Sequence, residues 1–141
     1  MMKRIFLTLA IALATSLTFA SCNADNRVPE PVKAAIKNLY PNISKLHWNS
    51  EAKGIWEAEF KNNGIQTSVT FDANGTMKEI ENEITMSDLP QAVQNYLKQN
   101  NLENKVKEIA KIVDANGVIT YEAEVKNKDL IFDNQGNIIS K

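Results

Sequence analysis

Two short stretches of the chain alternate strictly between apolar and acidic residues. Residues 56–60 read Trp-Glu-Ala-Glu-Phe, and residues 121–125 read Tyr-Glu-Ala-Glu-Val. Alternation with a period of two is typical of a β-strand that has one buried face and one exposed face. The chain therefore contains two copies of one half-buried strand, and we expect each copy to be the central strand of a sheet.

The order of elements around these strands is repeated as well. The two pentapeptides lie 65 residues apart, whereas flanking landmarks such as Asp72 and Asp133 lie 61 residues apart. The second half has gained four residues before its pentapeptide and lost four after it, and such compensating changes belong in loops or hairpin ends. The pattern predicts two tandem repeats, at residues 28–84 and 85–141.

Each repeat is predicted to begin with a helix. Apolar residues recur every three or four positions within 28–41 and again within 87–101, which places them on one helical stripe in each repeat. Pro41 ends the first helix, and Ser87 is the expected N-cap of the second.

Four strands are expected to follow each helix. The predicted strands are 44–50, 54–62, 65–72, 76–84, 105–114, 117–126, 129–133 and 137–140. The predicted fold class is therefore α+β, with two tandem repeats that each pack one helix on a four-stranded antiparallel sheet. Because a unit of about 60 residues is marginally stable alone, we expect the two units to pack together or to share a continuous sheet.

Glycine ends the predicted turns. The motif Asp-Ala-Asn-Gly stands at 72–75 and again at 114–117, and Asp-Asn-Gln-Gly stands at 133–136. Glycine supplies the positive φ angle that tight hairpin turns need. A calcium-binding EF-hand loop needs glycine in sixth place and glutamate in twelfth, whereas glycine is fourth here. The spacing favours hairpin turns.

The glutamates of the two pentapeptides are the main candidates for a binding role. If Trp56 and Tyr121 pack against the helices, the alternating acids point to the other side of the sheet. The candidate partner-binding face consists of Glu57, Glu59, Gln66, Ser68, Thr70, Glu122 and Glu124. Two interpretations stay open: the acids are solvated and pair with lysines such as Lys107 and Lys111, or they form a polar docking site.

Composition argues against several classes of function. His47 is the only histidine and Cys22 the only cysteine, so the chain lacks the ligands of a usual zinc site and the neighbours of a catalytic nucleophile. It contains no phosphate-binding loop, nucleophile elbow or dinucleotide fingerprint, and no basic patch with interleaved aromatics. We therefore expect no catalytic residues, no cofactor, no metal site and no nucleic-acid partner, with His47 exposed to solvent.

The first 22 residues have the layout of a secretory signal peptide, with a basic start, an apolar middle and small residues at the end. The apolar run is shorter than the ~20 residues that a membrane span needs. Two cleavage modes stay open: ordinary secretion, or a bacterial lipobox whose Cys22 becomes lipidated. The lone cysteine favours lipidation, with residues 23–27 as a spacer. Removal of the signal leaves 14 basic and 17 acidic residues, a net charge of −3.

These features together resemble the PepSY-like, β-lactamase-inhibitor-protein-like family, which is secreted or membrane-anchored and typical of Bacteroidota. The matching segments are 56–60 with 71–75 and 121–125 with 132–136, and the resemblance extends over about 28–141. It implies an α+β fold with a helix packed on an antiparallel sheet in each repeat. It also implies a non-catalytic role in the envelope, binding or restraining a hydrolase. The chain departs from the pattern in its second repeat, whose last long hairpin is four residues shorter.

The expected function is a cell-envelope binding module that docks a protein or peptide partner and inhibits or restrains a hydrolase. The expected location is the periplasm, either as an outer-membrane-anchored lipoprotein or, alternatively, as a soluble secreted protein. The alternative function is a periplasmic small-molecule or ion-binding protein.

Overall fold

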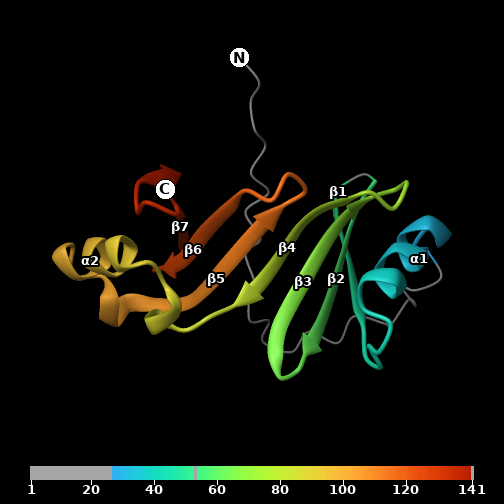
Figure 1. Ribbon diagram of the computed structural model, residues 1–141, viewed down its shortest axis with the longest axis horizontal. Helices are drawn as coiled ribbons and strands as arrows, with labels where there is room; N and C mark the ends of the chain where they lie inside the picture. The colour runs from blue at the N-terminus through green and yellow to red at the C-terminus, as the bar shows by residue number, and fades with distance from the viewer. Residues whose placement is uncertain (1–26, 53, 141) are drawn as a thin grey trace, which may run out of the picture.

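One antiparallel sheet forms the framework of the protein. The computed structural model describes residues 27–52 and 54–140, so the predicted signal peptide and the lipidation site Cys22 lie outside the described residues. In chain order the elements are α1 (Glu30–Leu39), β1 (His47–Ala52), β2 (Ile55–Asn62), β3 (Ile65–Asp72), β4 (Met77–Glu83), η2 (Met86–Asp88), α2 (Gln91–Gln99), η3 (Glu103–Lys105), β5 (Val106–Asp114), β6 (Ile119–Val125), β7 (Lys128–Asp133) and β8 (Ile138–Ser140). The strands stand in the sheet in the same order, from β1 to β8 (Figure 1).

The predicted α+β fold of two tandem repeats, each with one helix on its own four-stranded sheet, is wrong. β4 pairs with β5 over five residue pairs, from Glu79 opposite Asp114 to Glu83 opposite Ala110. This pairing makes one eight-stranded sheet, and with only two short α-helices the described chain is mostly β. Separate sheets would leave the backbone donors and acceptors of β4 and β5 unpaired at two edges, and the pairing satisfies them.

The individual strands agree better with the sequence than the fold class does. All eight begin and end within three residues of the predicted bounds, because period-two alternation and turn glycines are local signals. Ser87, however, is not the N-cap of the second helix. Thr85 and Asp88 form a capping box around η2 instead, and α2 begins only at Gln91, after Pro90.

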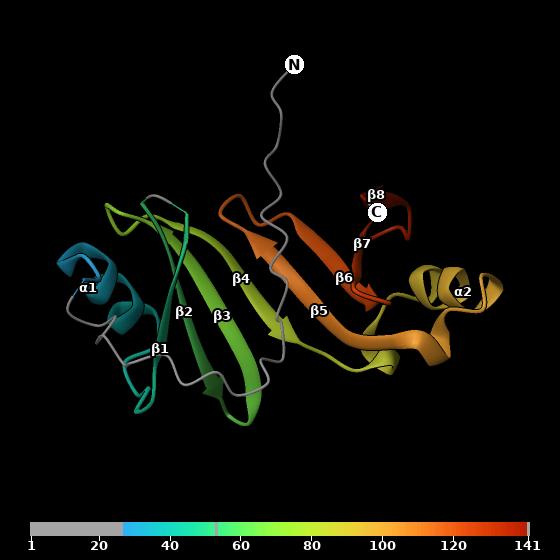
Figure 2. The same cartoon turned by 180° about the vertical axis from the view of Figure 1, so that it is seen from behind.

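Both helices pack on the same side of the sheet, here called the helix face. In the strand register Trp56 lies opposite Phe71, and Tyr121 lies opposite Phe132, as expected for residues under a helix. The cluster under α1 contains Val28, Val32, Ile36, Trp48, Ala58, Phe60, Val69 and Phe71. The cluster under α2 contains Leu89, Val93, Leu97, Ile109, Ala123, Val125, Leu130 and Phe132. The helices therefore cover opposite ends of the twisted sheet (Figure 2).

The three turns with aspartate in first place share one hydrogen-bond pattern. In each turn the aspartate Oδ1 accepts from the backbone N–H groups two and four residues later, at 2.8–3.0 Å. The aspartates are Asp72, Asp114 and Asp133. This arrangement explains the recurring motif by local hydrogen bonding, since aspartate side chains commonly close turns in this way.

Two of these turns also fix a helix to the sheet. A Cβ atom added at Gly75 would lie 2.5 Å from the carbonyl oxygen of Pro31, at the start of α1. A Cβ atom added at Gly136 would lie 2.4 Å from Cβ of Ala92, at the start of α2. Glycine at these positions therefore allows both a positive φ angle and close contact with a helix.

Candidate functional site

The side of the sheet opposite the helices, here called the open face, carries the predicted binding residues. In the register His47 lies opposite Glu59, and Glu57 lies opposite Thr70, on the side that alternates with the aromatic residues. The open face contains every residue of the predicted set, namely Glu57, Glu59, Gln66, Ser68, Thr70, Glu122 and Glu124. It also contains Glu79, Glu81, Glu83, Glu108, Asp114 and Asp129. The open face is therefore strongly acidic.

The acids that β4 contributes to this face were not predicted from the sequence. Glu79, Glu81 and Glu83 occupy every second position of the strand, in the same alternation as the two pentapeptides. A search for period-two acids without an aromatic partner would have found them. Their alternate neighbours include Lys78 and Asn82 instead of large apolar residues, which weakened the signal.

In the part of the open face that β1 and β2 form, here called the first half, one side-chain amide binds both glutamates of the pentapeptide. Asn49 of β1 donates through Nδ2 to Glu59 Oε1 at 2.9 Å and to Glu57 Oε2 at 3.3 Å. Only 1% of the surface of Glu57 is exposed, so of the two interpretations left open, solvation does not hold for this residue. Hydrogen bonds to a charged acceptor offset part of the cost of burying it.

In the second half of the open face, acids lie opposite other acids. The pairs are Glu79 with Asp114, Glu108 with Glu124, and Glu124 with Asp129. Like charges directly opposite each other on a sheet are destabilising. The position opposite Glu122 in β5 is Ala110, which has no donor to offer. The second copy of the duplicated strand therefore lacks the amide that supports the first.

One of the two predicted lysine partners is in place. Nζ of Lys107 lies 3.3 Å from Oε1 of Glu124, and it also donates to the side-chain oxygen of Asn127. Lys111 instead lies on the helix face, opposite Tyr121, so its predicted pairing with the glutamates is wrong. The bulge between Val106 and Glu108 is the local irregularity that lets Lys107 reach the acids.

Burial and mutual repulsion raise the pKa of several of these acids. Burial, followed by repulsion from Glu122, raises the pKa of Glu81 to about 8. Burial, followed by repulsion from Asp129, raises the pKa of Glu122 to about 7. Burial is also the largest cause that raises the pKa of Glu79 and of Glu108. The open face therefore holds protons that exchange near neutral pH.

The open face of the second half contains a hollow of about 400 Å³, here called the acidic hollow. Its aliphatic lining is Ile112, Val118, Ile119, Ile131 and Ile139. Its carboxylates are Glu79, Glu81, Asp114, Glu122 and Asp133. The acidic hollow therefore joins apolar surface to a concentration of carboxyl groups.

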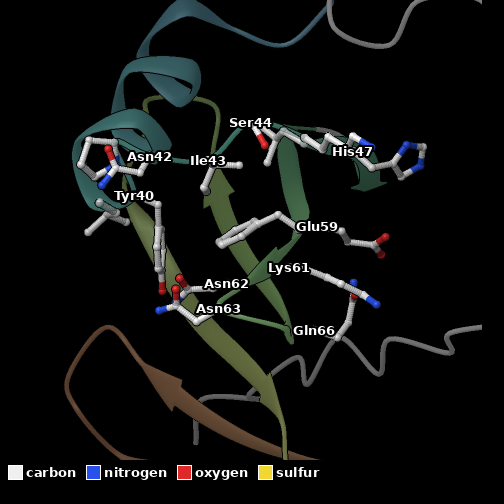
Figure 3. Close-up of a pocket in the computed structure, with 15 residues that line it drawn as sticks. Tyr40, Asn42, Ile43, Ser44, His47, Glu59, Lys61, Asn62, Asn63 and Gln66 are labelled. Atoms are coloured by element: carbon white, nitrogen blue, oxygen red, sulfur yellow. The ribbon is translucent and has the colours of Figure 1, made fainter.

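A second cavity of about 640 Å³ lies where β1 begins, between the α1–β1 connection and the β2–β3 hairpin. His47 and Glu59 point to one side of it, whereas Tyr40 and Asn42 lie on the other (Figure 3). His47 is exposed and Trp48 is buried, as predicted from their alternation. The cavity offers aromatic, amide and charged groups to a ligand at the edge of the sheet.

Two classes of structural feature are absent from residues 27–52 and 54–140. No group of three or more His, Cys, Asp or Glu residues there is arranged to hold a metal ion. No helix within the same residues is long and apolar enough to cross a membrane.

Comparison with known proteins identifies relatives of this fold. Residues 54–140, more than half of the chain, match the family described as "Putative beta-lactamase-inhibitor-like, PepSY-like". None of the curated proteins matches the chain.

Three solved structures from Bacteroides resemble the protein. One, from Bacteroides eggerthii and described among "putative periplasmic proteins", is 20% identical, covers 80% of this chain and 86% of its own, and has a TM-score of 0.69. A DUF2874 family protein from Bacteroides uniformis is 24% identical, with coverage of 79% and 86% and a TM-score of 0.66. A BLIP-like protein from Bacteroides fragilis is 24% identical, with coverage of 79% and 84% and a TM-score of 0.64. At these identities the likeness shows the fold alone.

Proposed function

Because this chain belongs to the PepSY-like family, we propose that it is a non-catalytic binding module whose open face docks a protein or peptide partner. The family description is β-lactamase-inhibitor-like, which supports a module that inhibits or restrains a hydrolase. Its place of action in this proposal is the cell envelope.

The observation that carries the proposal is the one-sided cover of the sheet. Both helices pack on the helix face, so the acids of the open face are left to contact other molecules. Strands hold side chains in a fixed register, which suits a rigid docking surface. The like-charge pairs of the second half point the same way, since residues selected for stability alone would avoid them.

Export supports the envelope location. Residues 1–22 have the layout of a signal peptide, and one structural relative is described as periplasmic. Metabolic labelling of cells with a palmitate analogue tests whether Cys22 carries a lipid. We expect the chain to be labelled and Cys22→Ala to remove the label. A labelled Cys22→Ala chain, or an unlabelled natural chain, would leave soluble secretion as the mode of export.

Affinity purification from envelope extracts tests the docking surface. The bait is the purified chain, and the variant carries Glu59→Lys and Glu124→Lys, two half-buried residues of the open face. Glu57 is left unchanged because a lysine at so buried a position would disturb folding. A matched double variant, Glu30→Lys and Glu103→Lys, changes the same charge at exposed positions outside the sheet.

We expect a partner that the natural chain and the matched variant both retain and that the open-face variant loses. A partner retained equally by all three chains would remove the open face from the proposal. Turnover of a substrate by the purified chain would contradict its non-catalytic character.

A second candidate function is a small-molecule binding protein, favoured by the cavity of about 640 Å³ at the start of β1. A ligand that binds only the folded state raises the melting temperature, so thermal-shift screening tests this candidate. A ligand of this cavity should lose its effect in Tyr40→Ala and keep it in Tyr96→Ala, which removes the edge-to-face contact of Tyr96 with Phe132 under α2.

A further inference from the structure

The acidic hollow presents apolar surface on an otherwise polar side of the sheet. Val118 and Ile139 keep 49% and 45% of their surface exposed, and both line it. Ile112 and Ile131 lie on the open face beside them, opposite Glu81 and Glu122. Covering such surface contributes roughly 25 cal/mol per Å². The hollow therefore favours a ligand that carries an aliphatic part.

The carboxylates beside this surface lack counter-charges. Glu79, Glu81 and Glu122 make no hydrogen bond or ion pair with another residue that the structure describes. Asp114 and Asp133, in contrast, accept hydrogen bonds from their own turns. The three glutamates are therefore available to a ligand, and a positive charge beside them would favour their ionised forms.

We propose that the acidic hollow binds a lysine or arginine side chain presented by a segment of a partner protein. This inference rests on the proposed docking function and names the chemistry of the partner. Lysine and arginine lay their methylene stems along apolar surface while their charged ends stay in polar surroundings. A cation among Glu79, Glu81 and Glu122 also relieves the repulsion between acids that the free sheet contains.

Other ligand classes fit the hollow less well. The described residues contain no group arranged to hold a metal ion, and a bare ion would leave the aliphatic lining uncovered. A neutral aliphatic side chain would bury the carboxylates without a partner, which is costly. An anion would be repelled by Glu79, Glu81 and Glu122.

Binding of a cation is linked to proton release. The charged groups that act on Glu81 are Glu122 from β6, Glu79 from its own strand, Glu108 from β5 and Asp129 from β7, all of them acids. The residues directly opposite it, Ser68 and Ile112, carry no charge. A nearby positive charge favours the ionised form of each acid and lowers its pKa. Affinity for a cationic segment is therefore expected to rise between about pH 6 and pH 8.

Direct titration with synthetic peptides tests the proposal. The probe is a fluorescent Gly/Ser peptide with three spaced lysines, and a second probe carries arginines instead. Three matched peptides replace lysine with norleucine, which keeps the stem without charge, with diaminobutyric acid, which keeps a positive charge on a stem half as long, or with glutamate. Fluorescence anisotropy with the purified chain gives Kd at pH 6, 7 and 8 and at two salt concentrations.

Two pairs of variants locate the site. Glu79→Gln with Glu122→Gln removes charge from the hollow, and Glu30→Gln with Glu103→Gln is its matched control. Ile139→Ser removes exposed aliphatic surface from the hollow, and Ile65→Ser does the same at the β2–β3 hairpin, where 50% of the side chain is exposed. Melting temperatures show that each variant is folded.

We expect the lysine or arginine peptide to bind at least about tenfold more tightly than the three matched peptides, a difference of about 1.4 kcal/mol. Glu79→Gln with Glu122→Gln should weaken it about tenfold and Ile139→Ser about threefold, with both controls within about twofold. No binding, binding unaffected by the hollow variants, or equal affinity for the diaminobutyric acid peptide would overturn the inference. So would self-association of the chain that the hollow variants abolish without a peptide. A partner lost from the open-face variant in extracts would keep the proposed function in each of these cases.

Discussion

The two copies of the duplicated strand differ in what lies across from them. In β2 the glutamates face His47 and Asn49, and the amide of Asn49 donates to both. In β6 they face Glu108 and Ala110, which supply one further charge and no donor. In the first half one amide therefore supports both glutamates, whereas in the second half Glu124 pairs with Lys107 and Glu122 is surrounded by acids. The comparison teaches that neighbouring strands, more than the repeat itself, set the chemistry of a duplicated residue.

The cores under the two helices should not share this difference. Phe71 and Phe132 occupy equivalent places and are both fully buried. We expect Phe71→Ala and Phe132→Ala each to lower the free energy of unfolding by about 3–5 kcal/mol, since each leaves a large cavity. Urea denaturation measures both. A loss in one half of less than about a third of the loss in the other would show that the halves are unequal in packing as well.

The cost of replacing the glycine of an aspartate turn should depend on whether that turn contacts a helix. Gly75→Ala and Gly136→Ala should each destabilise by about 2–4 kcal/mol, because the new Cβ combines a positive φ angle with a clash against α1 or α2. Gly117→Ala should cost about 1–2 kcal/mol, since it has the same φ sign but nothing within 4 Å. Equal losses at Gly75 and Gly117, two glycines of the same motif, would contradict the role given to the helix contact.

The second half, where acids lie opposite acids, should make the free energy of unfolding depend on pH. Glu81 has its ordinary pKa of 4.5 raised to about 8 in the fold, so the folded state keeps a proton that the unfolded chain releases. This contribution is fully present below about pH 4.5 and is lost as pH rises through about 8, so stability should fall by about 1–3 kcal/mol over that range. Chemical denaturation at pH 4.5, 6, 7 and 8 measures the slope.

Neutral variants sharpen this prediction. Glu81→Gln should flatten the pH dependence and should be more stable than the natural chain at pH 8. Glu57→Gln should bring no such gain, because Asn49 already stabilises the carboxylate in the first half. A pH dependence unchanged by Glu81→Gln would place the titrating groups elsewhere.

The smallest change in stability is expected when the side-chain amide of Asn49 is removed. Asn49→Ala should lower the free energy of unfolding by about 1–2 kcal/mol, because Glu57 and Glu59 lose a donor. Thr120→Ala, on the open face of the second half, should change it by less than about 0.5 kcal/mol. If Asn49→Ala is as neutral as this control, the two halves do not differ in the way described.

Local sequence patterns predicted the individual strands and turns better than they predicted how the two halves join into one sheet. Trp56 and Tyr121 pack toward the helices as their alternation indicated, and the turn glycines adopt positive φ angles. The small size of each repeat left a shared sheet as one of two options. Nothing in the sequence specified the pairing of β4 with β5, because α2 and two short helical turns intervene along the chain. Glu79 opposite Asp114 even argues against it, since a sequence gives no reason to place two acids together.

The candidate site was predicted in outline and missed in its most concentrated part. The sequence placed the four pentapeptide glutamates on one side of a sheet, which strand periodicity alone determines. The burial of Glu57 and the acidic hollow depend on which strands become neighbours, so they follow only from the register. The two cavities likewise depend on how turns and connections fold over the strand ends.

The β4–β5 pairing joins two parts of the sheet that each have their own apolar cluster. The chain can therefore be cut between these parts without dividing either cluster. A chain cut after Glu83 would yield two fragments, each with one helix, one apolar cluster and one newly exposed strand edge. The two edges match over five rungs, so the fragments should find each other by backbone complementarity. Two such fragments would serve as a split reporter. The acids that lie opposite each other across the β4–β5 pairing would control how tightly the fragments associate.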